Sequence, residues 1–356
     1  MIDLDDLNAI GALDSEDVLG AVERFPDQCR EAWDIGRAAT GLPDATGVDS
    51  MLVLGMGGSG VSGDVVQTIL EERLTVPMRV IKSYGPLPEW VGRNTLVFAV
   101  SYSGSTEETM AALEDAQARG CRAVAISSGG PLAELAVTHG FAHVAIPSGQ
   151  QPRASLGYLT IPILAVLVEM GLAPDLQDDI DEAIEVLSDL ASRCHRKRSY
   201  AENPAKDLAH KLAGKVAIVY GGFPLGATAA YRFKCDLNEY GKAPAFSHFF
   251  PELNHNEIVG WNKVAEVTKQ SFVLVLLRDP ADHERVKIRF EITTDLIRSS
   301  FADVVEITAE GSSALARLLS LIFVTQLAAI YVGLANGVDP GPMKIIQGLK
   351  GQLADR

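Results

Sequence analysis

The sequence predicts an α/β protein made of two doubly wound domains, each with a mainly parallel sheet flanked by helices. Three observations lead to this prediction. Short apolar runs of strand length alternate with helical patterns over residues 49–146. Two of these runs end in turns rich in Gly and Ser that open into helices. Residues 202–356 then repeat this plan, as expected after an old duplication.

The composition fits a soluble globular protein with room for two domains. The chain has 356 residues, of which 47% are hydrophobic and 22% are charged. The net charge of −15 disfavours nonspecific binding to nucleic acids and to anionic membrane surfaces. An anionic substrate would therefore have to be held by local hydrogen-bond donors and a few placed cations.

The cysteines and histidines predict neither a metal centre nor a redox site. The four cysteines form no C-x-x-C pair, and the seven histidines do not cluster at metal-ligand spacing. The acidic N-terminal stretch lacks the apolar core of a secretory signal. We therefore expect a reduced, cytoplasmic protein that needs no cofactor.

Residues 1–45 are acidic and helix-prone, and predict a helical lead-in packed on the first domain. The first domain is expected over residues 46–175. Its strands are predicted at 51–54, 78–82, 95–100, 121–127 and 141–146, and its helices at 60–72, 106–119, 131–139 and 154–171. The last of these helices is apolar, but it contains Pro162 and Glu169, which favours a buried helix over a membrane span.

An acidic helix over residues 176–201 is expected to connect the two halves. The second domain, residues 202–356, has predicted strands at 215–220, 271–277 and 303–308, and helices at 227–240 and 313–335. The long apolar helix contains Arg317 and Gln326, which again argues against a membrane span. A helix that includes residues 343–350 ends the chain, and this half lacks a hydroxyl-rich loop.

The two Gly/Ser-rich turns of the first domain are candidate anion sites. Glycines let backbone N–H groups approach a ligand, hydroxyls add donors, and a helix N-terminus carries partial positive charge. The first turn spans Gly55–Gly60, and the second runs from Ser101 to Thr109. Many short donors suit a compact phosphate held from two sides, and the candidates are Gly58, Ser59, Ser101, Ser103, Ser105 and Thr106.

These turns have two other interpretations. The Gly55–Gly60 turn also fits the dinucleotide-binding pattern G-x-G-x-x-G, which expects a carboxylate at the end of the next strand. Lys82-Ser83-Tyr84 stands there instead, which disfavours a dinucleotide. The second alternative is a pair of ordinary α/β turns with helix caps.

Two segments of the second half carry more polar groups than a plain connection needs. They are residues 233–246 and 249–261. The second places Glu252, Asn254, His255, Asn256 and Glu257 within six residues, close to Trp261.

With these segments, the chain resembles the bifunctional phosphoglucose/phosphomannose isomerases, which are built from two sugar isomerase (SIS) domains. The resemblance covers roughly residues 45–356, and its pieces occur in the right order. They are the Gly55–Gly60 turn, the Ser101–Thr109 loop, the Arg153 segment, the helix end at Glu239, the Pro251–Trp261 segment and a C-terminal lysine.

The resemblance implies a metal-independent aldose–ketose isomerase that interconverts glucose 6-phosphate or mannose 6-phosphate with fructose 6-phosphate through a cis-enediol. It implies a phosphate pocket at Ser59, Ser101, Ser103, Ser105 and Thr106, although family members often have Asn where this chain has Ser105. It assigns the base to Glu239, ring opening to His255 and stabilisation of the enediolate to Arg153. The C-terminal lysine is Lys350, with Lys344 as the competing candidate.

This assignment agrees with the chemistry of proton abstraction beside a carbonyl. The reaction needs a shielded carboxylate and a cation near the developing oxyanion. The bland alternative for each residue is an ordinary solvated charge at the surface.

The family also implies a homodimer in which His255 reaches the neighbouring subunit's pocket. Apolar side chains at Phe249, Phe250 and Trp261 suit such an interface. Filling their own domain's core is the alternative. Whether His255 serves its own subunit stays open here, as does the preference between the two aldoses.

Two other classes of function fit the sequence less well. A sugar-phosphate-binding regulator would keep the pocket without catalysis. The first 45 residues show no basic recognition helix, and the presence of Glu239 and His255 favours an enzyme. A glucosamine-6-phosphate synthase needs an N-terminal cysteine, whereas Ile2 follows Met1 here.

Overall fold

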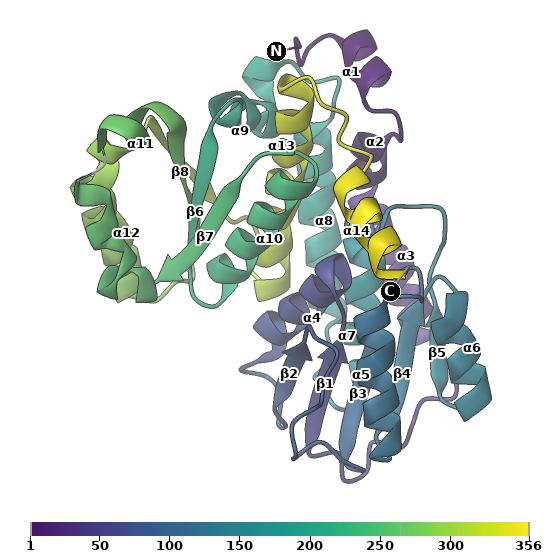
Figure 1. Cartoon of the computed structure of the whole chain (residues 1–356). Helices are drawn as coiled ribbons and strands as arrows, with labels where there is room; N and C mark the ends of the chain where they lie inside the picture. Colours follow the sequence, from purple (N-terminus) through teal and green to yellow (C-terminus); the bar gives the residue numbers. More distant parts are fainter. Residues whose placement is uncertain (1, 264, 355–356) are drawn as a thin grey trace. The chain divides into compact units, whose positions relative to one another are not determined.

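The computed structural model describes residues 2–263 and 265–354, which form two compact units (Figure 1). The first-sheet unit consists of residues 24–189 and 310–320. Of the described residues, the second-sheet unit contains 2–23, 190–263, 265–309 and 321–354.

The sheet of the first-sheet unit has five parallel strands in the order β2-β1-β3-β4-β5. Its strands are β1 (Ser50–Leu54), β2 (Met78–Ile81), β3 (Thr95–Val100), β4 (Arg122–Ser127) and β5 (Ala142–Ala145). The central strands β1 and β3 are buried along their whole length, which explains their unbroken apolar runs. All five predicted strands are confirmed.

Helices cover both faces of this sheet. On one face α4 (Gly57–Leu70) packs against α7 (Leu156–Glu169), which in turn contacts α3 (Phe25–Arg37). On the other face α5 (Glu107–Ala118) and α6 (Gly130–His139) share an apolar core with β1, β3 and β4. The helices predicted in this half are therefore confirmed.

The second sheet has four parallel strands in the order β7-β6-β8-β9. They are β6 (Val216–Gly222), β7 (Ala245–Phe250), β8 (Phe272–Arg278) and β9 (Asp303–Thr308). The order matches that of the first four strands of the first sheet, so the predicted repetition of the plan is confirmed. The edge strand β7 was not predicted, because Ser247 and His248 interrupt its apolar pattern and four of its six residues are partly or fully exposed.

The helices α10 (Leu225–Glu239) and α13 (Ala314–Ala335) lie on one side of the second sheet, and α11 (Ala265–Ser271) and α12 (Glu284–Ile297) on the other (Figure 1). The sequence did not predict α9 (Pro204–Leu212), α11, α12 or the 3₁₀ turns η3 (Glu252–His255) and η4 (Glu257–Asn262). By length and composition α13 could cross a membrane, but its most apolar window is entirely buried, so it is a core helix. The chain continues to α14 (Lys344–Ala354).

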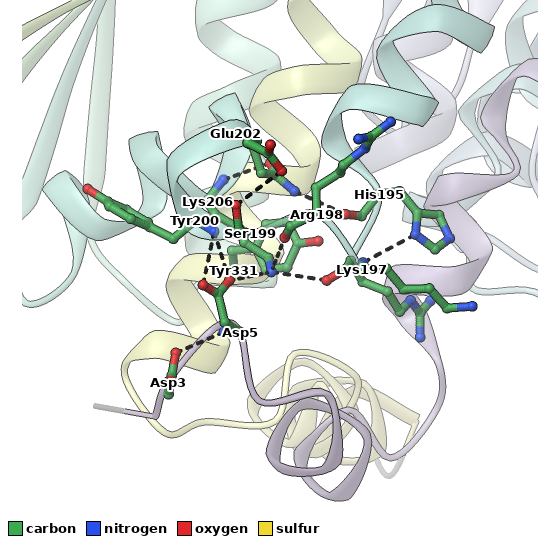
Figure 2. A network of polar contacts seen from close by, with 12 residues as sticks. Asp3, Asp5, His195, Lys197, Arg198, Ser199, Tyr200, Glu202, Lys206 and Tyr331 are labelled. Carbon is green, nitrogen blue, oxygen red and sulfur yellow. Dashed lines mark hydrogen bonds and ion pairs between the residues drawn. The ribbon is translucent and has the colours of Figure 1, made fainter.

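The N-terminal segment is divided between the two units, which differs from the expected lead-in on the first domain. The helices α1 (Leu7–Leu13) and α2 (Val18–Glu23) belong to the second-sheet unit, together with the end of α8 (Gln177–Cys194). A buried ammonium holds them there: Lys206 Nζ donates to Asp5 Oδ1 at 3.0 Å and to the carbonyl oxygens of Arg196 and Arg198 at 3.0 and 2.7 Å (Figure 2). Arg196 also pairs with Glu23 at 2.9 Å. These polar contacts join residues far apart in sequence, so no local pattern announces them.

Candidate active site

The Gly-rich turn after β1 lies against the segment that carries Arg153. A Cβ on Gly58 would stand 3.2 Å from the carbonyl oxygen of Pro152 and 3.5 Å from Arg153 Cα. Ser59, in the first turn of α4, is buried. The absence of a side chain at Gly58 therefore lets the N-terminus of α4 approach the short 3₁₀ turn η1 (Pro152–Ala154).

The hydroxyl-rich loop follows β3 and leads into α5. Its hydroxyls form two pairs: Ser101 Oγ lies 2.8 Å from Thr106 Oγ1, and Ser103 Oγ lies 3.0 Å from Ser105 Oγ. Ser101 is buried, whereas Ser103 and Ser105 are exposed to solvent. Thr106 is the N-cap residue of α5, so the loop ends at a positive helix terminus. The arrangement is suited to an anion.

Close backbone contact fixes the shape of this loop. Gly104 has φ +68°, and a Cβ there would lie 1.9 Å from the carbonyl oxygen of Gly129. The Gly104 carbonyl accepts a hydrogen bond from Leu132 N at 2.9 Å. Only glycine satisfies both the left-handed backbone and the close approach.

Arg153 is almost fully buried in η1, with 8% of its surface exposed. A hydrogen bond ties the residues before it to the hydroxyl-rich loop, because the backbone N–H of Gln150 donates to the side-chain hydroxyl oxygen of Tyr102 at 2.8 Å. The predicted phosphate ligands and Arg153 are thus linked within the first-sheet unit, at the carboxyl ends of β1 and β3.

The second-sheet unit places Glu239 at a cavity. Glu239 is the last residue of α10 and is half-buried. A cavity of about 700 Å³ is lined by the end of α10 and by the chain that leads into α14, including Asn238, Glu239, Lys242, Met343 and Lys344. Of the two candidate lysines, Lys344 shares this cavity with Glu239, whereas Lys350 is not among the described residues that line it. Asn238 and Lys242 were not predicted as site residues.

His255 lies elsewhere in the same unit, at the exposed end of η3. Its loop is anchored by the buried Leu253 and by Asn254, whose side chain donates to Thr293 Oγ1 at 2.7 Å and accepts from Arg289 at 3.1 Å. Among the described residues that line the Glu239 cavity, His255 does not occur.

The two glutamates beside His255 have other partners. Glu257 accepts a hydrogen bond from the buried Tyr220, and burial together with this bond raises the pKa of that phenol. Glu252 accepts from Asn256 at 3.0 Å. Glu257 therefore holds its own loop to the sheet, a role that does not require it to move a proton.

The three aromatic residues around this segment do not act alike. Phe250 is completely buried, and the Trp261 ring packs on Phe301 at 4.6 Å in the same core. For Phe250 the alternative of filling its own core is confirmed, whereas Trp261 is half-buried and packs against that core. Phe249 is half-buried and lies 5.4 Å from the exposed Phe223 ring.

The second-sheet unit has carboxylates where the first has hydroxyls. After β8, the strand that corresponds to β3, stand the buried Asp279 and Asp282. Asp282 crowds the end of β6 so closely that a Cβ on Gly222, the last residue of the strand, would lie 2.3 Å from its Oδ1. Burial, followed by the nearby Asp279, raises the pKa of Asp282 to about 6. This loop is therefore unsuited to phosphate, in agreement with the sequence prediction for the second half.

The chemical groups available are hydroxyls, amides, carboxylates and cations. Within residues 2–263 and 265–354, no group of three or more His, Cys, Asp or Glu side chains is arranged to hold a metal ion.

Comparison with known proteins agrees with this architecture. Residues 46–170 match the SIS domain, and residues 201–353 match the bacterial phospho-glucose isomerase C-terminal SIS domain. A bifunctional phosphoglucose/phosphomannose isomerase of Caldicellulosiruptor bescii is 39% identical over 94% of this chain and 98% of its own length. One from Aquifex aeolicus is 34% identical over 95% of this chain and 98% of its own.

Solved structures match the fold. A glucose-6-phosphate isomerase like protein from Thermus thermophilus aligns with a TM-score of 0.65 at 19% identity, over 97% of this chain and 100% of the other.

Proposed function

Because this chain belongs to the family of bifunctional phosphoglucose/phosphomannose isomerases, we propose that it interconverts glucose 6-phosphate and mannose 6-phosphate with fructose 6-phosphate. The observation that carries the proposal is the near full-length relationship, which covers both SIS domains. The anion-suited edge of the first sheet and the Glu239 cavity support it.

In this proposal the phosphate binds at the first sheet. Ser59 and the backbone of Gly58 would donate from the N-terminus of α4, where unpaired N–H groups favour an anion. The remaining donors would be the hydroxyls of the Ser101–Thr106 loop, namely Ser101, Ser103, Ser105 and Thr106. Exposure of Ser103 and Ser105 leaves them accessible to a ligand.

The chemistry would be carried by four further residues. His255 would move the proton that opens the sugar ring, and Glu239 would take the proton from C2 of the open-chain aldose. The O1 oxygen then carries the developing negative charge of the enediolate, which Arg153 would stabilise. Transfer of the hydroxyl proton from O2 to O1, followed by return of the proton from Glu239 to C1, would then give the ketose. For the C-terminal lysine the sequence favours Lys350, while Lys344 lines the Glu239 cavity.

An assay of fructose 6-phosphate formation from both aldoses tests the activity. Glu239→Gln keeps the shape of the side chain but cannot accept a proton, so kcat should fall by about 10²–10⁴-fold with little change in phosphate affinity. Activity should persist after prolonged EDTA treatment. Loss with EDTA and recovery with zinc would contradict the base mechanism.

The alternative is a regulator that binds the sugar phosphate without turning it over. Calorimetric binding of fructose 6-phosphate without formation of either aldose would favour that alternative. Free glucose is the control substrate, since equal turnover of glucose and glucose 6-phosphate would exclude the loop as a phosphate site.

We further propose a homodimer with shared sites, in which Glu239 of one chain works with His255 of the other. The absence of His255 from the described lining of the Glu239 cavity supports this division. Glu239→Gln and His255→Ala homodimers should each be inactive. Randomly mixed chains should recover roughly a quarter of wild-type activity, because about half of the dimers are mixed and half of their sites are intact.

In a verified mixed dimer, absence of recovery would place His255 in its own subunit's pocket or outside the site. A cytoplasmic location is proposed as well, since all four cysteines are free thiols, as is usual in a reducing compartment.

A further inference from the structure

Lys242 has a backbone conformation that is unfavourable for a residue with a side chain. Its φ of +48° lies in the left-handed region, where among the described non-glycine residues only Asp17 joins it. A lysine is disfavoured there relative to glycine, the usual residue just past a helix end. Such an exception points to a role for the side chain.

The ammonium of Lys242 bridges two segments that lie about 100 residues apart in sequence. Its Nζ donates to the carbonyl oxygen of Glu239, in the last turn of α10, and to the carbonyl oxygen of Pro340 at 3.2 Å. It also lies 3.4 Å from Met343 Sδ. Because carbonyls at the end of a helix lack partners within the helix, a cation there is favourable.

The turn that Lys242 reaches is held from a second side as well. The Ser15 hydroxyl donates to Asp339 Oδ2 at 2.6 Å, and Asp339 Oδ1 accepts from Gly341 N at 2.9 Å. This turn enters α14 and supplies Val338, Asp339 and Met343 to the lining of the Glu239 cavity. Lys242 therefore joins the two segments that line the cavity, the end of α10 and the turn before α14.

Backbone packing leaves the end of α10 little freedom elsewhere. A Cβ on Gly333, in α13, would stand 2.4 Å from the Tyr240 carbonyl oxygen, and one on Gly241 would stand 3.3 Å from a methyl of Val332. The buried Tyr240 hydroxyl accepts from Gln326 of α13 at 3.2 Å. The Glu239 backbone is thus fixed against α13 on one side and against the 339–343 turn by Lys242 on the other.

We propose that Lys242 is a positioning residue that sets the Glu239 carboxylate against the 339–343 wall of its cavity. This proposal rests on the proposed role of Glu239 as the base. It assigns Lys242 no contact with substrate: its effect passes through the position of the Glu239 backbone. An ordinary helix-capping lysine, by contrast, would affect only stability.

The decisive variant is Lys242→Gly, which removes the bridge and also relieves the left-handed backbone. We expect its melting temperature to equal or exceed that of the wild type, while kcat falls about 10- to 100-fold, the scale associated with misplacing a reacting group by about 1 Å. KM should change less than about threefold, because the phosphate ligands lie in other loops. Lys242→Arg should recover part of kcat.

Three further measurements make the result unambiguous. Lys211→Gln is the matched control, since Lys211 lies in the last turn of another helix and its ammonium binds the Asp207 side chain; its kcat should equal that of the wild type. In a Glu239→Gln background, Lys242→Gly should cause no further loss. Hydrogen exchange of the 337–343 backbone should accelerate in Lys242→Gly, a readout that requires no isomerase activity.

Unchanged kcat in Lys242→Gly would overturn the proposal, as would a kcat that falls only together with the melting temperature. An additional loss in the Glu239→Gln background would show that Lys242 acts by another route. If the wild type shows no isomerase activity, the proposed function fails, and hydrogen exchange still decides whether Lys242 holds the turn.

Discussion

Replacement of Gly104 by alanine tests whether close backbone contact shapes the hydroxyl-rich loop. Gly104 and Gly140 have nearly the same φ, +68° and +70°, but their surroundings differ. A Cβ at Gly140 would meet nothing within 4 Å, whereas one at Gly104 would lie 1.9 Å from the Gly129 carbonyl oxygen. Gly140→Ala is therefore a matched control that isolates the cost of the left-handed backbone.

The expected magnitudes follow from these distances. Gly140→Ala should lose about 1 kcal/mol of unfolding free energy, the usual cost of a left-handed alanine. In Gly104→Ala the two backbones must separate by roughly 1.4 Å to reach a normal C···O contact of about 3.3 Å. That movement breaks the bond from Leu132 N to the Gly104 carbonyl and leaves a buried acceptor, so the total loss should be about 2–4 kcal/mol.

Urea denaturation followed by circular dichroism measures both losses. Ser103 and Ser105 flank Gly104, so Gly104→Ala should also raise KM for hexose 6-phosphates, and Gly140→Ala should not. Equal destabilisation by the two variants would refute the steric argument. A destabilised Gly104→Ala protein with wild-type KM would separate the loop's shape from phosphate binding.

Three further substitutions give separate tests. The double variant Ser103→Ala, Thr106→Ala should weaken the binding of every sugar phosphate by about 1.5–3 kcal/mol per lost hydrogen bond to the charged ligand, as measured by calorimetry. An affinity within a few-fold of wild type would contradict the assignment of this loop as the phosphate site. Asp282 has a folded-state pKa of about 6 against an ordinary value of 3.8, so ionising it costs folding free energy; this cost develops as pH rises from about 4 to 6 and is complete above that range. Asp282→Asn should therefore stabilise the protein in urea denaturation by up to about 3 kcal/mol at pH 8 and by less at pH 5. An equal stabilisation at both pH values would contradict the raised pKa of Asp282. Lys206→Met keeps the buried aliphatic part of the side chain but removes three hydrogen bonds, so it should lower the unfolding free energy by about 3 kcal/mol. It should also speed proteolysis of the residues before α1. Unchanged proteolysis would contradict the anchoring of Asp5 by Lys206.

The sequence predicted those elements that are buried over a continuous stretch of chain and therefore show a local apolar pattern. The strands β1 and β3 are apolar after their first residues because both faces of a parallel sheet are covered. The hydroxyl-rich loop could be found because its donors lie within six residues, Ser101 to Thr106. The edge strand β7 could not, because a strand with partial exposure and polar residues at its centre lacks that signal.

Within the candidate site, sequence resemblance selected the residues, but the tertiary structure decided which of them meet. Among the described residues, Lys344 lines the cavity at Glu239 and Lys350 does not, because the turn before α14 is held beside the end of α10. Trp261 looked suited to an interface, but the structure packs it, half-buried, on the rings of Phe272 and Phe301 beside its own domain's core. The identity of a single residue in the sequence does not show whether its side chain packs in its own domain or at an interface.

The sequence by itself determined the α/β class, the repeated plan and the composition of the anion loop, because all three are local patterns of burial and hydrogen-bonding groups. Only the tertiary structure decided that residues 2–23 belong with the second sheet, and that Lys242 joins α10 to the turn before α14. Each outcome depends on a lysine ammonium that reaches an oxygen about 100 to 200 residues away in sequence: Lys206 reaches the Asp5 carboxylate, and Lys242 reaches the Pro340 carbonyl. Such pairings are set by three-dimensional distance and desolvation, to which the spacing of residues along the chain gives no guide.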